Sequence, residues 1–214
     1  MLMTFLYWLE NLRIPVINEL MLGITYLGDE IAFLVVALIL MWCVDKRTGY
    51  YVLSVGFLGT IANQFMKLWF RIPRPWVLDE NFTILEQARE AASGYSFPSG
   101  HTQSAVGTFG AIAAGTKQKW LRILCISLCV LVAFSRMYVG VHAPKDVLVA
   151  AVIAVALILL LKPVTLHRGV QAITGLIVFM LAVAAGLLLY VELFPFPADV
   201  DEENLQSGIK NAYT

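Results

Sequence analysis

Charged residues are scarce in this chain, and neither sign prevails. Only 14% of the 214 residues are Asp, Glu, Lys or Arg, and 15 acidic residues balance 15 basic ones. A nucleic-acid-binding surface needs a basic excess or a Lys/Arg-rich tract, and the chain has neither. We therefore expect no nucleic-acid partner.

Cysteine is also scarce, because the chain has only Cys43, Cys125 and Cys129. There is no Cys-x-x-Cys pair and no histidine at metal-ligand spacing beside them, which argues against a zinc site or a redox pair. We interpret the three thiols as small apolar side chains. Carboxylates form no cluster of the kind that binds Mg²⁺. The sequence thus predicts no metal and no other cofactor.

Apolar sequence, in contrast, is abundant. Hydrophobic residues make up 59% of the chain, and the mean hydropathy is +0.77, which lies outside the balance of soluble domains. A membrane span needs roughly 20 apolar residues, and six stretches approach this. They run from about Ile31 to Val44, Tyr50 to Phe70, Thr102 to Gly115, Trp120 to Phe134, Val147 to Leu161 and Val170 to Leu193. The pattern predicts an all-α, polytopic membrane protein with a six-transmembrane-helix bundle.

The first 23 residues follow a different pattern. Glu10, Arg13 and Glu19 alternate with apolar residues, which favours a helix lying in the membrane interface over a seventh span. No internal repeat or low-complexity linker divides the chain. We expect one domain over residues 1–214, with an interfacial helix at 1–23 and a polar tail at 199–214.

The distribution of basic residues predicts an orientation. The connections after the first, third and fifth spans are short and basic, and the positive-inside rule places them in the cytoplasm. The loop from about Arg71 to Phe97, the turn from Gly140 to Pro144 and the acidic tail Asp199 to Glu203 then face outward. The small size and the lack of retention signals favour a bacterial inner membrane.

One polar motif stands at the start of the third span, where Pro98 is followed by Ser99, Gly100 and His101. The first N–H groups of a helix lack internal partners and attract anions. Ser99 as an ordinary N-cap is the alternative. His101 favours a functional role, because an imidazole at an anion site can donate a proton to a leaving oxygen near neutral pH.

A second motif lies at the start of the fifth span. His142 and Asp146 are four residues apart, so their side chains can meet on one helix face. A carboxylate on one imidazole nitrogen leaves the other free to attack. The alternative is that Asp146 only stabilises the helix N-terminus and His142 is merely interfacial.

Three cations, Lys67, Arg74 and Arg136, stand at the predicted outer ends of the second and fourth spans. Together they could neutralise a phosphate monoester and its transition state, and Arg can grip two phosphate oxygens at once. Snorkelling of these side chains toward lipid headgroups is the competing interpretation. Arg71 follows Lys67 by four residues and would share its face if the helix continues that far. We then expect it to contact a second phosphate.

The three motifs together resemble the signature of the type 2 phosphatidic acid phosphatase (PAP2) superfamily. Its first part, Lys, six residues, Arg-Pro, matches Lys67 to Pro75. Its second part, Pro-Ser-Gly-His, matches Pro98 to His101. The third, Ser-Arg, five residues, His, three residues, Asp, matches Ser135 to Asp146. A triple match at fixed spacing is far more specific than any one motif.

The resemblance implies a catalytic role for each motif residue. His142 would be the nucleophile that forms a phosphohistidine, oriented by Asp146. His101 would protonate the leaving group and then activate water, with no metal required. The residues implied to hold the phosphoryl oxygens are Lys67, Arg74, Arg136, Ser99 and Gly100.

The expected substrate is a phosphorylated membrane lipid, because the site lies at the interface and the long loop carries the aromatics Trp76, Phe82, Tyr95 and Phe97, which suit headgroup depth. A lipid diphosphate of the undecaprenyl type or phosphatidate comes first, followed by phosphatidylglycerophosphate and sphingoid phosphates. A phosphotransferase using the same histidine, a haloperoxidase and a lipid-binding transporter are the alternatives. The sequence says nothing of the oligomeric state.

Overall fold

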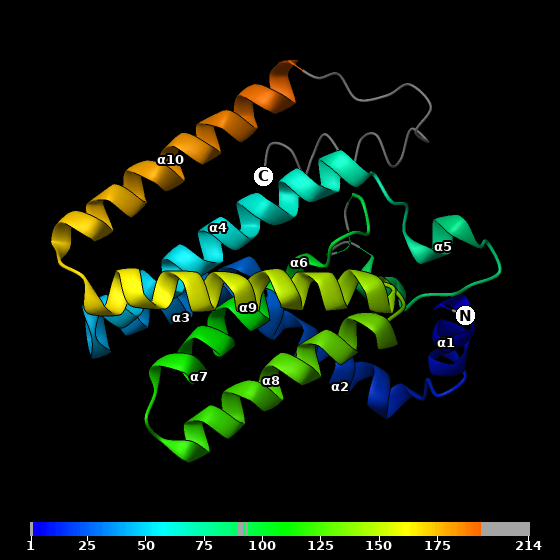
Figure 1. The fold of residues 1–214 in the computed structure, drawn as a ribbon. Coiled ribbons are helices and arrows are strands. Elements are labelled where there is room, and N and C mark those ends of the chain that lie inside the picture. The colour runs from blue at the N-terminus through cyan, green and yellow to red at the C-terminus, as the bar shows by residue number, and fades with distance from the viewer. Residues whose placement is uncertain (1, 90–91, 93, 194–214) are drawn as a thin grey trace.

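All of the regular structure in the described residues is helical. The computed structural model describes residues 2–89, 92 and 94–193. The helices, shown in Figure 1, are α1 (Leu2–Glu10), α2 (Pro15–Thr25), α3 (Glu30–Ile39), α4 (Lys46–Phe70), α5 (Pro75–Leu78), α6 (Gly100–Ala105), α7 (Ala111–Gly115), α8 (Lys119–Tyr138), α9 (Pro144–His167) and α10 (Val170–Leu193). The all-α prediction is confirmed for this part of the chain.

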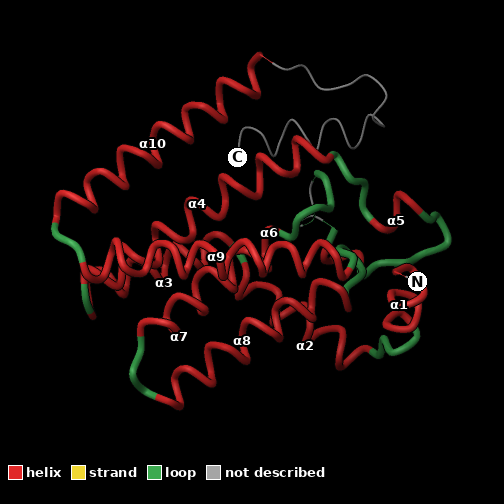
Figure 2. The backbone as a smooth tube through the Cα atoms, viewed as in Figure 1, coloured by secondary structure: helices red, strands yellow, loops and turns green. Residues whose placement is uncertain are grey.

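Short irregular helical turns extend or join several of these helices. A 3₁₀ turn, Tyr26–Gly28, follows α2, and a π-helical turn, Leu40–Val44, extends α3. A second π-helical turn, Val106–Gly110, joins α6 to α7, so that residues 100–115 are helical throughout. Another 3₁₀ turn, Glu86–Ala88, lies in the long loop between α4 and α6, which Figure 2 shows.

The centre of the bundle is the packing of α4 against α6, α9 and the π-helical turn Val106–Gly110. The fully buried Tyr51 of α4 donates its hydroxyl to the backbone oxygen of Ile158 in α9, at 2.8 Å. Gly110 allows close approach, because a Cβ there would lie 2.8 Å from Cδ1 of Ile158. This packing brings the end of α4 and the starts of α6 and α9 to one end of the bundle, at the right of Figure 1.

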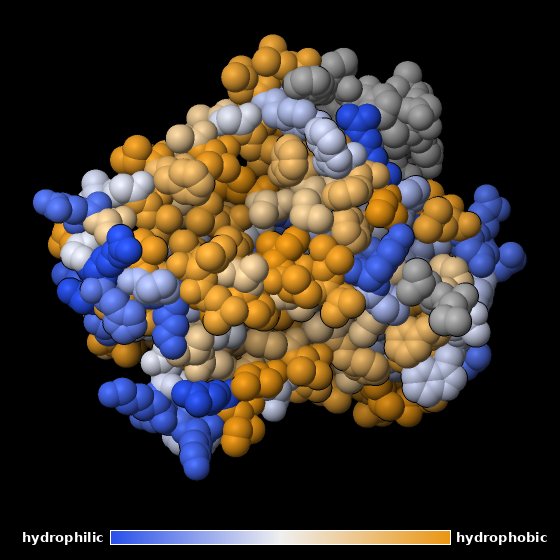
Figure 3. Space-filling view, viewed as in Figure 1, coloured by the Kyte–Doolittle hydropathy of each residue, from blue (hydrophilic) through white to orange (hydrophobic). Residues whose placement is uncertain are grey.

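Within the described residues, three helices, α8, α9 and α10, are long and apolar enough to cross a membrane. The segments Pro15–Gly28 and Glu30–Val44 add a fourth crossing if the pair, bent by 55°, counts as one span. The remaining predicted spans coincide with α4 and with residues 100–115, but α4 is less apolar and the other run is shorter. The six-span count therefore stays a prediction. On the face in Figure 3, apolar side chains cover the flanks and polar ones gather at the ends, as in a membrane protein.

The N-terminal segment 1–23 is not a single helix. Pro15 begins α2 and disfavours helical backbone in Ile14 before it, so the chain breaks between α1 and α2. Leu6 and Leu9 of α1 are fully buried against the long loop and the end of α8. An interfacial position of this segment stays a prediction, whereas its packing on the protein is a finding.

Polar contacts hold the long loop onto this N-terminal segment. Nη1 of Arg13 donates to the backbone oxygen of Thr83 at 2.8 Å, and its Nε donates to that of Tyr138 at 3.1 Å. The hydroxyl of Tyr7 donates to Asp79 at 2.9 Å. Because the same loop carries Arg74 and leads into α6, the N-terminal helices position part of the site.

One expectation for the flanking regions changes, and another is not tested. Phe82 and Tyr95 are each 3% exposed, so they belong to the protein interior and do not face lipid headgroups. Phe82 sits where the loop folds back over α1 and the end of α8. The predicted acidic tail, Asp199 to Glu203, and the rest of 199–214 lie outside the described residues.

Candidate active site

The predicted site residues converge from four helix ends. Lys67 lies in the last turn of α4, Arg136 in the last turn of α8, and Asp146 in the first turn of α9. Ser99 caps α6, and its backbone N–H donates to the backbone oxygen of Asp146 at 3.1 Å. This bond joins the starts of α6 and α9, so the second and third sequence motifs form one structural unit.

His142 is held between a guanidinium and a carboxylate. Nη1 of Arg74 lies 2.9 Å from Nε2 of His142, and Oδ2 of Asp146 lies 3.6 Å from Nδ1. The same Nη1 lies farther from Nδ1, at 3.5 Å. A guanidinium can only donate hydrogen bonds, so the shorter contact assigns the lone pair to Nε2. The proton then belongs on Nδ1, the side of Asp146. This is the tautomer that a nucleophilic Nε2 requires.

Asp146 is buried and only partly satisfied. Its Oδ2 accepts the backbone N–H of Ala143 at 2.9 Å and the hydroxyl of Ser96. Its Oδ1 is buried and meets no hydrogen-bond partner among the described residues. The bond to Ala143 supports the helix-capping alternative, so Asp146 both caps α9 and faces His142.

Arg74 is anchored by the loop and by the turn that carries His142. Its Nε donates to the backbone oxygen of Gly94, and its Nη1 donates to that of Val141, both at 2.9 Å. The side chain is 2% exposed, and burial lowers the pKa of Arg74 to about 10. The residue therefore remains a cation at neutral pH.

Lys67 and Arg136 are buried as well, with 7% and 0% of their surfaces exposed. This burial contradicts the snorkelling interpretation, since neither side chain reaches outward to lipid headgroups. Nη1 of Arg136 donates to Oγ1 of Thr25 at 2.7 Å. Nε and Nη2 of Arg136 are buried and find no acceptor within the described part of the chain. Unpaired buried donors on a cation are costly, which indicates that an anion completes the site.

The start of α6 supplies an open, polar surface. A Cβ added to Gly100 would meet only Oδ1 of Asn63, at 3.9 Å, so there is room beside this backbone. Ser99 accepts the N–H and the hydroxyl of Thr102, at 3.4 and 2.9 Å, as an N-cap does. Nε2 of His101 is buried without a hydrogen-bond partner in the described residues.

Electrostatics favour an anion at this place. Lys67 interacts with the charges of Arg74, Arg136, the exposed Glu30 and Asp146, so the buried basic side chains outnumber the buried carboxylate of Asp146. Burial, followed by the charges of Arg74, Arg136 and Lys67, lowers the pKa of His142 well below its ordinary value. The imidazole is therefore neutral at physiological pH, as its contact with Arg74 also requires.

The expectation for Arg71 rested on a helix continuing through it, and that premise is wrong. Helix α4 ends at Phe70, and Arg71 adopts a left-handed conformation with φ of 50°. Its Nε donates to the backbone oxygen of Leu68 at 2.9 Å, which turns the side chain back along the helix. Contact with a second phosphate stays a prediction without support from a shared helix face.

Three residues of the site escaped the sequence analysis. Thr25 holds Arg136, and Ser96 holds Asp146. Asn63 is 3% exposed, with Nδ2 unpartnered among the described residues. Only Asn63 had a sequence signal, because it precedes Lys67 by four residues and shares its helix face. No group of three His, Cys, Asp or Glu that could hold a metal occurs in the described residues.

Comparisons with known proteins agree with this arrangement. The chain is 31% identical to an undecaprenyl-diphosphatase of Sulfolobus acidocaldarius over 64% of its length and 65% of that protein's length. It is 31% identical to phosphatidylglycerophosphatase B of Bacillus subtilis, over 71% and 76% of the two chains. The first match thus spans slightly less than two thirds of the relative.

Solved structures give the same result at the level of the fold. A transmembrane PAP2-type phosphatidylglycerolphosphate phosphatase from Bacillus subtilis superposes with a TM-score of 0.63, at 26% identity, over 77% of this chain and 86% of that one. LpxE of Aquifex aeolicus shares the fold, with a TM-score of 0.61 at 24% identity over 74% and 92% of the chains. The family model described as the PAP2 superfamily matches residues 47–170, which include all three motifs. The chain is therefore an integral membrane protein that belongs to the PAP2 superfamily.

Proposed function

We propose that the protein hydrolyses a phosphate monoester or a diphosphate of a membrane lipid. The observation that carries this proposal is the position of His142. Its Nε2 accepts a hydrogen bond, and so bears a lone pair, in the midst of three buried cations. A nucleophile surrounded by phosphate-binding cations is suited to phosphoryl transfer.

In the first step, Nε2 of His142 attacks phosphorus and forms a P–N bond while the P–O bond to the lipid breaks. Burial and the neighbouring cations lower the pKa of His101, so His101 takes up a proton as the anionic lipid phosphate binds. It then gives this proton to the departing oxygen, whether that oxygen belongs to an alcohol or to a lipid phosphate. Asp146 stabilises the positive charge that develops on the imidazole. Lys67, Arg74 and Arg136 hold the phosphoryl oxygens, with Ser99 and the N–H of Gly100.

In the second step, His101 takes a proton from water, whose oxygen attacks phosphorus and breaks the P–N bond. Inorganic phosphate leaves, and both histidines return to their starting states. Arg74 has to leave Nε2 before the first step, because its N–H occupies the lone pair at 2.9 Å. A bound phosphate supplies a better acceptor for the guanidinium, so substrate binding itself would release the nucleophile.

The names of the relatives guide the choice of substrate. They include two undecaprenyl-diphosphatases, a phosphatidylglycerophosphatase and a probable sphingosine-1-phosphate phosphatase. We propose an undecaprenyl diphosphate or phosphatidate type of lipid, with phosphatidylglycerophosphate and sphingoid phosphates next. The basic connections lie at the opposite end of the bundle from the site, so the positive-inside rule supports an extracytoplasmic site in a bacterial inner membrane.

The test is phosphate release by the full chain in detergent, with a chelator present, on each of these four lipids. Release that His142→Ala abolishes would support metal-independent histidine chemistry. His167→Ala is the matched control, because this histidine is exposed at the far end of α9 and its loss should leave the rate unchanged. Trapping of ³²P on the wild-type protein, but not on His142→Ala, would identify the phosphohistidine.

The alternatives predict different outcomes. A phosphotransferase would pass the phosphoryl group from His142 to an added lipid alcohol in preference to water. A lipid transporter would move lipid without releasing phosphate, and it would survive His142→Ala. A haloperoxidase would need vanadate in place of phosphate. Absence of release from every lipid tested would contradict the hydrolase proposal.

A further inference from the structure

A second polar feature lies far from His142, at the other end of α9. A cavity of about 520 Å³ opens between the helical run 100–115, α8 and α9. This volume is within the range of about 300–1,000 Å³ that is usual for ligand pockets. Lys162 lines the end of the cavity that is farther from His142. It follows Asp146 by four and a half turns of α9, or about 24 Å. The groove is thus separate from the proposed active site.

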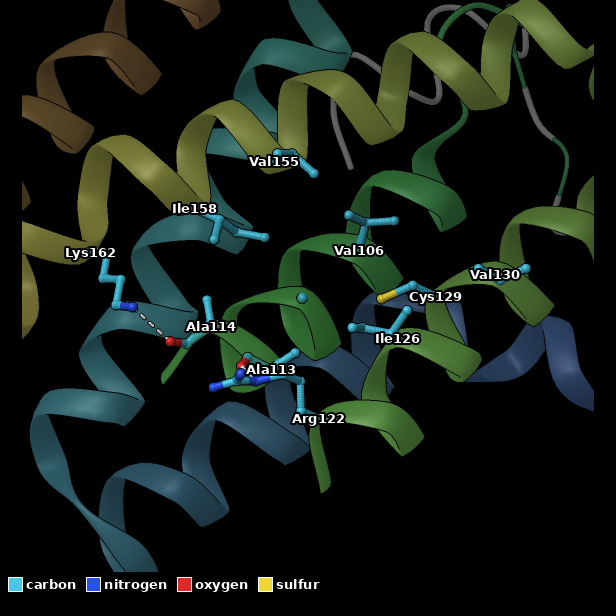
Figure 4. Close-up of a pocket in the computed structure, with 11 residues that line it drawn as sticks. Val106, Ala113, Ala114, Arg122, Ile126, Cys129, Val130, Val155, Ile158 and Lys162 are labelled. Carbon is cyan, nitrogen blue, oxygen red and sulfur yellow. Dashed lines mark hydrogen bonds between the residues drawn. The ribbon is translucent and has the colours of Figure 1, made fainter. Parts of the chain in front are cut away.

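The walls of the groove are apolar and face the membrane. Ile126 and Val130 of α8 are 51% and 62% exposed, and Val155 of α9 is 46% exposed. Figure 4 shows these side chains around the hollow between the two helices, and Val106 and Ile158 line it too. In a bilayer such a surface is covered by hydrocarbon, so an acyl chain is its natural filling.

Two basic side chains close one end of the groove, and none of the described residues that line it is acidic. Nζ of Lys162 donates to the backbone oxygen of Ala114 at 2.8 Å. Arg122 donates from Nε to Ala113 at 3.2 Å and from Nη2 to Thr116 at 2.8 Å. These bonds anchor both cations at the end of α7, as Figure 4 shows for Lys162 and Ala114.

Both cations retain donors for a ligand. Nη1 of Arg122 makes no hydrogen bond to another described residue, and Lys162 uses one of its three N–H groups. Two anchored cations at the end of an apolar groove match a phospholipid with an anionic headgroup, whose phosphate accepts hydrogen bonds while its chain lies along the helices.

We propose that this groove binds one anionic phospholipid, with the phosphate between Arg122 and Lys162 and an acyl chain against Ile126, Val130 and Val155. The bound lipid is a structural ligand and not the substrate, because the site lies at the end of the bundle opposite His142. It packs α7 against α8 and α9 where the protein leaves a hollow. The inference does not depend on the proposed phosphatase activity.

The test is native mass spectrometry of the purified full chain, delipidated in detergent and titrated with phosphatidylglycerol or with phosphatidylcholine of the same acyl chains. We expect one phosphatidylglycerol to bind and to be retained better than phosphatidylcholine. The double variant Arg122→Gln/Lys162→Gln should weaken this binding by about tenfold or more, since each cation near a lipid phosphate contributes severalfold.

Lys117→Gln/Lys119→Gln is the matched control. It removes the same charge at the same end of the bundle, from exposed lysines that do not line the groove, and should leave binding unchanged. Val130→Trp should displace the acyl chain and weaken binding without altering the cations. An equal loss of phosphatidylglycerol binding in the control would show that surface charge alone causes the effect, and would overturn the proposal. Undiminished binding in Val130→Trp or in the Arg122→Gln/Lys162→Gln variant would overturn it as well.

Discussion

His142 and Arg74 share the contact on which the proposed chemistry depends. The guanidinium fixes the tautomer and, with burial, keeps the imidazole neutral, but it also covers the attacking nitrogen. Arg74 thus both favours the attack and blocks it. The backbone oxygens of Gly94 and Val141 hold its side chain on both sides. It can turn between Nε2 and a phosphate without losing all its other partners.

The lowered pKa of His142 predicts the acid side of the pH profile. Protonation of Nε2 would stop the attack, so kcat/KM should fall only below pH 6.5, the ordinary value for histidine. Arg74→Gln removes a neighbouring cation, so the pKa of His142 should rise and the acid limb should move to higher pH. Arg74→Lys retains the charge and should leave the limb near its wild-type position.

The lowered pKa of His142 also makes the stability of the folded protein depend on pH. Because the folded state holds His142 with a lowered pKa, the unfolded chain binds more protons below about pH 6.5. The stability contributed by the neutral imidazole is present above that pH and is lost as the pH falls.

A pH profile of kcat/KM that is identical in wild type and in Arg74→Gln would contradict the role given to Arg74.

The carboxylate of Asp146 should contribute more to kcat than the hydrogen bond that Ser96 donates to it. Asp146→Asn retains an acceptor for Ala143 but removes the charge that stabilises the His142 cation. We expect kcat to fall by about 10²- to 10⁴-fold, as when the carboxylate of a catalytic triad is lost. Ser96→Ala removes one neighbour of the carboxylate and should lower kcat by about tenfold or less. Phosphate-release assays at saturating lipid measure both, and equal losses would contradict this ranking.

At the scale of elements, the site depends on how closely the bent pair α2–α3 approaches α6. A Cβ on Gly28, in the turn that ends α2, would lie 2.7 Å from the backbone oxygen of His101 and 2.8 Å from Cγ1 of Val132. Backbone atoms cannot give way as a side chain can. The absence of a side chain at Gly28 therefore sets the position of the first turn of α6.

Gly28→Ala should push α6 away from the bent span and move His101 with it. We expect a loss of about 1–3 kcal/mol of stability, as for other overpacked contacts, together with lower kcat. Gly23→Ala is the control, because a Cβ there meets nothing within 4 Å. In helix α2 it should be neutral or stabilise by up to about 1 kcal/mol. Thermal unfolding and phosphate release would separate the two, and equal behaviour would contradict the close-packing argument.

At the scale of the whole molecule, the two ends of the bundle differ in kind. One end gathers buried cations around His142. The connections that follow α3, α7 and α9 lie at the other end (Figure 1), and they carry exposed basic residues. Nη1 of Arg47 reaches the backbone oxygen of Leu166 at 3.3 Å, which shows that the first and fifth connections meet there. We propose that this end faces the cytoplasm, as the positive-inside rule favours.

Cys43 offers a test of this orientation without added residues. It is exposed beside the basic connection after α3, whereas Cys125 is buried and Cys129 is half-buried. A membrane-impermeant thiol reagent should label Cys43 in inside-out vesicles and not in intact cells. Cys43→Ser should abolish the labelling. Labelling from the outside of intact cells would reverse the proposed orientation.

The sequence alone was sufficient for the all-helical class and the family, and it named residues that the structure brings together, whose roles stay predictions. These depend on local properties, namely apolar runs and polar motifs at helix ends, and a helix end presents its free N–H groups whatever surrounds it. The spacing of His142 and Asp146 likewise places them on one face by helical geometry.

Only the tertiary structure decided which distant residues complete the site. Thr25 meets Arg136 across 111 positions of sequence, and Ser96 meets Asp146 across 50. It also ended α4 at Phe70, before Arg71, and buried Leu6 and Leu9 of α1 inside the protein. These outcomes follow from packing between segments far apart in the chain, where contacts depend on the shape of both partners and leave no periodic pattern in either one.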